Sequence, residues 1–184
     1  NKEVNAHNIK RLGSVAEPIA LIEAEHTGES RSMSDDVFRG LRSFRFLAVF
    51  ACVVMTSNVC QPAGLVNGSV GEVKDIIYED NTTAPALPKF VWVDFGSAYT
   101  GPTFIPNDDA RKGWVLVHPI TVTEWRKADN TEGYSEHTRR QLPLRLAWAW
   151  TAWKAQGQTI PGKLVADLGK TEKEHGLTYT VFSG

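Results

Sequence analysis

Between residues 44 and 122 the chain alternates short runs of β-branched and aromatic residues with loops rich in Gly, Pro and Asn. The clearest runs are 74–78, 89–95 and 114–122. The Asn67-Gly68 pair accepts a positive φ and predicts a tight turn, and we interpret Gly64, Gly68 and Gly71 as turn glycines. Short strands at this spacing are typical of a small barrel or a curled sheet, which we expect between residues 64 and 124.

The residues before this β-rich part carry mixed patterns. Segment 2–12 predicts an amphipathic helix that Gly13 could terminate, and segment 18–24 predicts a strand. Segment 32–41 places Ser and Asp ahead of apolar residues with the spacing of one helical face, which predicts a helix. The apolar run 46–55 is ten residues long. Because about 20 residues are needed to span a bilayer, we interpret this run as a buried strand.

The pattern changes again after a polar stretch that ends at residue 140. Apolar residues at three- and four-residue steps predict an amphipathic helix over 142–153, opened by Pro143. Segment 163–168 predicts a buried strand, and segment 177–182 begins one more element. The order helix, strand, β-rich part, helix, strand is that of an α/β layer with an insertion. We therefore expect three parts, which are residues 1–63, 64–124 and 125–184.

Composition narrows the class of protein. The chain has 184 residues, 42% of them hydrophobic, and its net charge is −1. Disorder is therefore unexpected, and no global field would draw the protein onto nucleic acid or an anionic membrane. Cys52 and Cys60 form no metal or disulfide pattern, which favours a reduced intracellular compartment. The chain has neither a G-x-S-x-G elbow nor a His cluster, and both its ends look cut.

Segment 141–160, which reads QLPLRLAWAWTAWKAQGQTI, carries the side chains best suited to chemistry. On a helix, Thr151 and Lys154 would present a hydroxyl and an ammonium on one face, suited to successive phosphates of a single strand. Gln156-Gly157 offers an amide and a close backbone approach, usable against a nucleotide phosphate. Trp148 and Trp150 are more often core residues than a base-stacking platform.

Two basic patterns leave alternatives open. Arg139, Arg140 and Arg145, with His137 beside them, either contact a DNA backbone or guard a solvated edge strand with their charges. A second set recurs every three residues and would form a basic stripe on a helix, with the same two interpretations: Arg39, Arg42 and Arg45.

Segment 141–160 resembles motif V of the Pif-type, RecD-like superfamily-one DNA helicases, whose usual form is Leu-Pro-Leu-x-Leu-Ala-Trp-Ala-Ile-Thr-Ile-His-Lys-Ser-Gln-Gly-Gln-Thr. Three more segments, in the right order, resemble the region near motif IV, the entry into an inserted β-barrel and the start of motif VI: 1–8, 54–71 and 176–183. The resemblance covers essentially the whole chain. It implies an α/β fold, namely a C-terminal RecA-like lobe with a parallel sheet and an inserted SH3-like barrel.

The resemblance also implies site residues. Thr151, Trp153 and Lys154 fall on the DNA side, to which we add Arg145 as a backbone contact, and Gln156 and Gly157 fall on the ATP side. No catalytic residue or protein metal ligand is assigned. At five positions the chain departs from the family's usual residue. The family has Ile at Trp150 and at Ala152, His at Trp153 and Ser at Ala155. At Gly184 it has the motif VI arginine.

The partners implied are single-stranded DNA and an N-terminal RecA-like lobe that would hold ATP and Mg²⁺. The sequence contains no G-x-x-x-x-G-K-[ST] phosphate loop and no acidic pair of Walker B type. We therefore expect no ATP hydrolysis by this chain alone. The alternative function is a non-catalytic module that binds nucleic acid or protein. We expect no membrane partner, and a location in the nucleus or mitochondrion if the source is eukaryotic.

Overall fold

Strands dominate the part of the chain that the structure, a computed structural model, describes, which is residues 2–127 and 133–151. Short 3₁₀ turns occur at Gln61–Ala63, Gly96–Ala98 and Asp109–Arg111. The remaining elements, in chain order, are α1 (Lys2–Leu12), β1 (Ala20–Glu23), β2 (Glu25–His26), β3 (Phe44–Leu47), β4 (Cys52–Met55), β5 (Val70–Ile77), β6 (Phe90–Asp94), β7 (Trp114–Val117), β8 (Ile120–Lys127), β9 (Tyr134–Gln141) and β10 (Leu144–Leu146).

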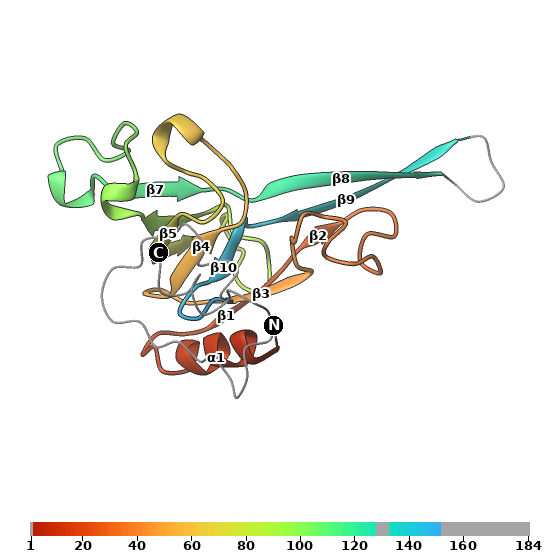
Figure 1. Ribbon diagram of the computed structural model, residues 1–184, viewed down its shortest axis with the longest axis horizontal. Coiled ribbons are helices and arrows are strands. Elements are labelled where there is room, and N and C mark those ends of the chain that lie inside the picture. Colours follow the sequence, from red (N-terminus) through yellow and green to blue (C-terminus); the bar gives the residue numbers. More distant parts are fainter. Residues whose placement is uncertain (1, 128–132, 152–184) are drawn as a thin grey trace, which may run out of the picture.

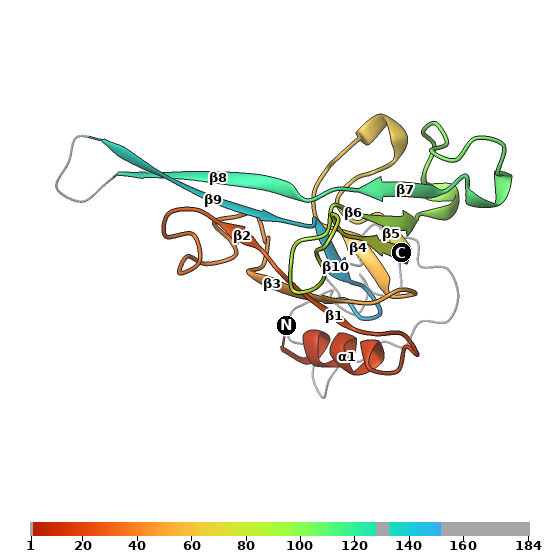
Figure 2. The same ribbon diagram turned by 180° about the vertical axis from the view of Figure 1, so that it is seen from behind.

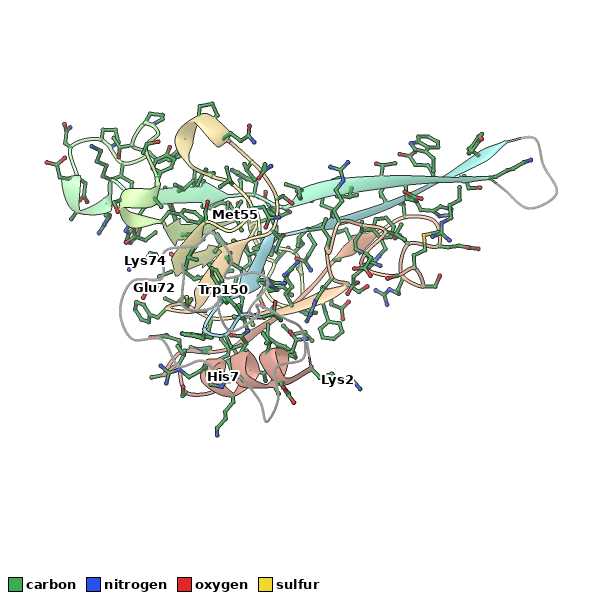
Figure 3. The ribbon with its side chains drawn as sticks, viewed as in Figure 1. Lys2, His7, Met55, Glu72, Lys74 and Trp150 are labelled. Atoms are coloured by element: carbon green, nitrogen blue, oxygen red, sulfur yellow. The ribbon has the colours of Figure 1, made fainter. Side chains whose placement is uncertain are left out.

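The largest sheet has five antiparallel strands in the order β10-β4-β5-β6-β7 (Figure 1). Alternate residues of its strands face the main core, as their two-residue period requires. The buried valines of β5, β6 and β7 are Val73, Val91, Val93, Val115 and Val117. On the opposite face an ion pair joins Lys74 to Glu72 at 2.7 Å, and Figure 3 shows the two side by side.

A second sheet has the order β2-β9-β8. Strands β8 and β9 form a long hairpin that extends beyond the rest of the chain in both views (Figures 1 and 2). A small second core, built on Phe38, Leu41 and Val122, lies where segment 27–42 meets this sheet. The third sheet is the pair β1-β3.

Several expected elements are confirmed. The helix at 2–12 is α1, and it ends before Gly13, although Gly13 does not adopt the left-handed conformation. The strand expected at 18–24 is β1. Gly64 and Gly68 have φ of 78° and 104°, as turn glycines should. Gly71 is different, because it lies inside β5, where a Cβ would come within 2.7 Å of the Asp94 carbonyl oxygen.

The helix expected at 32–41 is wrong, since this segment is a series of turns. Arg39 and Gly40 have φ of 53° and 78°, which no α-helix contains. The basic stripe of Arg39, Arg42 and Arg45 therefore does not exist. Phe38 and Leu41 are nevertheless fully buried, so the apolar pattern correctly marked core residues.

Two further expectations fail because strand pairing overrides the local pattern. The apolar run 46–55 is not one strand but parts of β3 and β4, separated by a turn in which Phe50 has φ of 64°. In the expected helix 142–153, the described residues 142–151 form β10 and bends instead. This strand pairs with β4, with Leu144 opposite Met55. The strands expected at 163–168 and 177–182 lie outside the described residues.

The expected parallel sheet is not found among the described strands, because all their pairings are antiparallel. No closed barrel forms between residues 64 and 124 either. Strands β5, β6 and β7 share their sheet with β4 and β10 from outside that segment, and β8 joins a different sheet. The fold is a sheet-rich α/β lobe, and the division at residues 63 and 124 stays a prediction. None of the described helices has the length and hydropathy required to traverse a bilayer.

Candidate nucleic-acid interface

A cavity of about 180 Å³ lies between α1, β3 and β10. Its lining comes from segments far apart in the sequence, which the pairing of β10 with β4 and the packing of α1 bring together. The lining residues are Asn5, Asn8, Ile9, Arg42, Phe44, Arg45, Phe46, Leu47, Leu142, Leu144, Arg145 and Leu146. They include three arginines and no carboxylate.

The aromatic side of the cavity belongs to β3. Because side chains alternate along a strand, Arg45 and Leu47 point inward while Phe44 and Phe46 point outward. The two phenylalanines are 55% and 38% exposed. Their rings pack edge to face with centroids 6.0 Å apart. Two exposed aromatic rings beside arginines are a surface on which nucleic-acid bases can stack.

Arg45 is buried although it carries a charge. Its guanidinium donates to the carbonyl oxygens of Leu144 and, at 3.4 Å, Gly40. Its Nε has no hydrogen-bond partner in the part of the chain that the structure describes. Burial, and then the charges of Arg42 and Arg145, lower the pKa of Arg45 to about 9. Desolvation and the two neighbouring positive charges therefore both disfavour the charged form of Arg45.

Arg42 and Arg145 complete the basic side. Arg42 is exposed and donates to Oδ1 of Asn5 at 3.3 Å. Arg145 is half-buried on β10, and its pKa is lowered by burial and by Arg42. No ion pair within the described residues involves any of the three arginines that line the cavity. The carboxylate that favours the charge of Arg45 belongs to Asp35, which is already 2.6 Å from Arg139.

Helix α1 is fastened to the chain that follows β10 by one buried side chain. Asn8 donates from Nδ2 to the carbonyl oxygen of Ala149 at 3.0 Å, and its Oδ1 accepts from the Ala149 amide at 2.8 Å. This paired contact joins residues 141 positions apart. It fixes one wall of the cavity against the other.

The structure places two of the predicted DNA-side residues. Arg145 lines the cavity, and Thr151 is half-buried at the end of the described segment. The other predicted DNA-side residues, Trp153 and Lys154, and the predicted ATP-side residues, Gln156 and Gly157, lie outside the described residues. Sequence reasoning missed Phe44 and Phe46, although their alternation with Arg45 and Leu47 was the available signal.

The core interpretation of the tryptophans is supported. Trp148 packs against the main core. Trp150 is half-buried and donates from its indole nitrogen to the carbonyl oxygen of Ala147 at 2.8 Å. Figure 3 labels Trp150 between the five-stranded sheet and α1.

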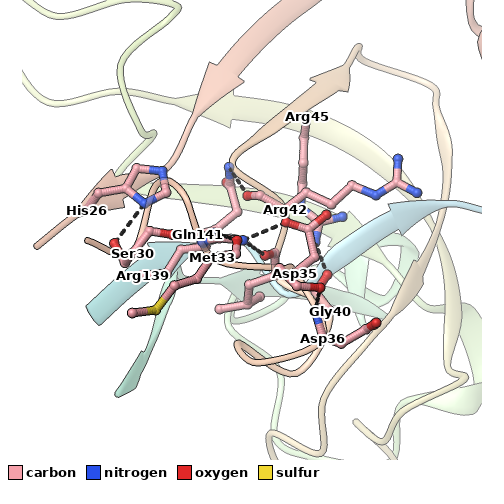
Figure 4. A network of polar contacts seen from close by, with 12 residues as sticks. His26, Ser30, Met33, Asp35, Asp36, Gly40, Arg42, Arg45, Arg139 and Gln141 are labelled. Atoms are coloured by element: carbon pink, nitrogen blue, oxygen red, sulfur yellow. Dashed lines mark hydrogen bonds and ion pairs between the residues drawn. The ribbon is translucent and has the colours of Figure 1, made fainter. Parts of the chain in front are cut away.

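Both interpretations of Arg139 are wrong. Its side chain is fully buried in β9, the central strand of its sheet, and it therefore neither meets DNA nor guards an edge. The guanidinium donates to the Asp35 carboxylate and to three carbonyl oxygens of segment 27–42 (Figure 4). Arg140 is exposed and pairs with Glu25 at 2.9 Å, and His137 is buried with Nδ1 accepting from the Glu29 amide.

Comparison with known proteins gives relatives of one kind. No family model matches the chain. It is 28% identical over 181 residues to the ATP-dependent DNA helicase PIF6 of Trypanosoma brucei brucei, which covers 98% of this chain and 20% of that protein. It is 32% identical over 143 residues to the ATP-dependent DNA helicase PIF1 of Emericella nidulans, covering 65% of this chain and 19% of that protein.

Solved structures agree. The crystal structure of the Pif1 helicase from Candida albicans matches 99% of this chain and 40% of that one, with a TM-score of 0.69 and 25% identity. The unliganded Pif1 of a Bacteroides species matches 86% of this chain and 41% of that one, with a TM-score of 0.55 and 20% identity, and thus shares the fold.

The fold and the relatives together define the class of protein to which the chain belongs, which is that of α/β helicase lobes. More particularly, the chain is a Pif1-like helicase segment, and it spans about a fifth of the length of the curated relatives it matches.

Proposed function

We propose that this chain is the C-terminal motor lobe of an ATP-dependent DNA helicase, and that the cavity between α1, β3 and β10 forms part of its contact with single-stranded DNA. One observation carries the proposal. Arg145, which the sequence assigns to DNA, lies in one cavity with Arg42 and with the exposed rings of Phe44 and Phe46.

The chemistry of these groups fits a single strand. Guanidinium groups bind phosphate oxygens through charge-assisted hydrogen bonds, which position a backbone without reading its sequence. Aromatic rings stack on unpaired bases, and every base offers such a face. The low net charge of the chain, −1, means that attraction must come from this local set of arginines rather than from a global field.

The ATP side of the proposal rests on residues outside the described part. Gln156 and Gly157 would face a nucleotide whose phosphates and Mg²⁺ are held by an N-terminal lobe with a phosphate loop. Within residues 2–127 and 133–151, no group of three or more His, Cys, Asp or Glu side chains could hold a metal ion. Bound ATP would supply the free energy that moves the two lobes, and we expect no turnover by this chain alone.

Fluorescence anisotropy with a labelled oligothymidine tests the proposal. We expect binding that weakens between low and moderate salt, because it releases counterions from the backbone. Replacing Arg145→Ala or Lys154→Ala should each lower affinity by about tenfold, which corresponds to about 1.4 kcal/mol per contact. ATP turnover is followed in the same samples.

Arg126→Ala is the matched control, since Arg126 is exposed on the hairpin and makes no ion pair in the described part of the chain. It should leave affinity nearly unchanged. Absence of binding at every salt concentration would contradict the DNA assignment. ATP turnover by the isolated chain would contradict the need for a second lobe.

A further inference from the structure

Three guanidinium groups converge on a single cavity. Arg42 comes from the segment before β3, Arg45 from β3 itself and Arg145 from β10. Arg42 and Arg145 both lie close enough to Arg45 to lower its pKa, and Arg42 lowers that of Arg145. The three cations therefore repel one another across a space that no atom of residues 2–127 or 133–151 is shown to fill.

The described residues offer these cations little compensation. Arg42 donates to the neutral amide of Asn5, and Arg45 donates to two carbonyl oxygens. None of the described residues that line the cavity is a carboxylate. Arg45 is 8% exposed and its Nε has no hydrogen-bond partner among the described residues, although buried charges in proteins are ordinarily paired. Ionisable groups with strongly perturbed pKa values cluster at functional sites, so a ligand is the first explanation to consider for Arg45.

From this geometry we infer that Arg42, Arg45 and Arg145 form a binding site for a phosphate group, with the amide of Asn5 as a further donor at its mouth. A phosphate group is small, is negatively charged and presents several acceptor oxygens in different directions, whether it is free or part of a nucleic-acid backbone. The planar fork of arginine matches such oxygens in pairs. An apolar or cationic ligand would leave the charges uncompensated, and a carboxylate has only two acceptor oxygens, which lie in one plane.

The inference deepens the proposed function and rests on it only for the source of the phosphate. Phe44 and Phe46 lie at the same cavity and would receive the bases on either side of a backbone phosphate. Free inorganic phosphate offers the same kind of acceptor oxygens with a higher charge and without the bases. The experiment must therefore detect the phosphate itself and then identify its source.

Thermal unfolding of the full chain in inorganic phosphate and in chloride at equal ionic strength detects the phosphate. We expect saturating phosphate to raise the unfolding temperature by about 3 °C or more above its value in chloride, because an anion that binds only the folded state stabilises it. Arg42→Gln and Arg145→Gln should each abolish this difference. They should also raise the unfolding temperature in chloride, since each removes a repelling charge.

These two positions are chosen because neither is fully buried, whereas Arg45→Gln could prevent folding. Arg126→Gln makes the same charge change on the hairpin and should retain the full phosphate effect. An equal unfolding temperature in phosphate and chloride would overturn the inference. So would a phosphate effect that survives in both Arg42→Gln and Arg145→Gln.

An abasic single-stranded oligonucleotide then identifies the source. If it raises the unfolding temperature and leaves no further effect for phosphate, the site takes the DNA backbone. If phosphate still acts in its presence, the site takes free phosphate, and the inference stands without DNA. Failure of the proposed function is recognised separately, because the chain would then show the phosphate effect but no anisotropy change with oligothymidine.

Discussion

Arg139 is the largest fully buried side chain in the described part of the protein, and its guanidinium organises segment 27–42. Its four hydrogen bonds reach Ser30, Met33, Asp35 and Leu41, and Figure 4 shows this network. The ring centroid of Phe38 lies 4.5 Å from the guanidinium carbon. One charged group thereby satisfies carbonyl oxygens that a helix would otherwise have satisfied internally. The segment can remain a series of turns for this reason.

Arg139→Met should lower the free energy of unfolding by about 3–5 kcal/mol, because it leaves buried carbonyl oxygens and one carboxylate without a donor. Urea denaturation measures the change. Arg140→Met, next to it in β9, removes only an exposed ion pair and should cost about 0–1 kcal/mol. Equal losses in the two variants would contradict the role assigned to Arg139.

His26 makes stability depend on pH. Burial, followed by the charges of Arg139 and Arg31, lowers its folded pKa below 6.5, and Glu23 opposes the shift. The unfolded chain therefore binds this proton more readily, and stability falls as pH drops through 6.5 towards the lower folded value. Between about pH 7.5 and about pH 5.5, the free energy of unfolding should fall less in His26→Gln than in the parent protein. His118→Gln is the control, and a loss in His26→Gln as large as in the parent would exclude His26.

At the scale of elements, the clearest link is the paired contact between Asn8 of α1 and Ala149. Asn8→Ala removes both hydrogen bonds and should speed hydrogen exchange of the Ala149 amide. Asn8→Asp keeps the acceptor and should preserve protection of this amide, while repelling the Ala149 carbonyl. Hydrogen exchange of the Ala149 amide, measured by NMR in both variants and in the parent, tests this prediction.

The Ala147 amide is the internal reference, because it donates to the carbonyl oxygen of Cys52 in β4 at 2.9 Å instead of to α1. Its exchange should stay unchanged in Asn8→Ala. If Ala147 and Ala149 accelerate together, the substitution has loosened the whole lobe instead of the α1 contact.

Elements whose local pattern agrees with their partners were predictable from sequence. Helix α1 and strand β6 are examples, since one has a clean helical period and the other lies between turn residues. Segment 32–41 was not, because its turns depend on Arg139 about a hundred positions later. Residues 144–146 were not either, because the edge of β4 is available only in the folded sheet.

The residues of the candidate site likewise include some that the sequence could predict and some that it could not. Arg145 could be chosen from sequence because it lies within a recognisable motif. Arg45 could not be separated from Arg39, since only the pleat of β3 shows which of them points inward. Phe44 received no role beyond the β-rich part, and Phe46 was assigned to the apolar run 46–55, for which burial is the usual expectation.

On the scale of the whole molecule, the late segments of the described chain complete structures that the early segments begin. Segment 27–42 is completed by β9, the five-stranded sheet by β10, and α1 by Ala149. Each of these contacts joins an early segment to one that follows more than 85 residues later. The main core of β4–β7 is thus closed by residues from both ends of the described chain, such as Leu12 and Leu144.

The late position of β10 sets the order of events during synthesis. Until residue 146 has left the ribosome, one edge of β4 has no partner, and the acceptors of segment 27–42 have no guanidinium until Arg139 has emerged. The free edge of β4 and segment 27–42 must therefore wait for these late residues, whereas β5, β6 and β7 pair with their neighbours in sequence. An open strand edge is exposed in the meantime, which is when an emerging chain is most vulnerable to aggregation.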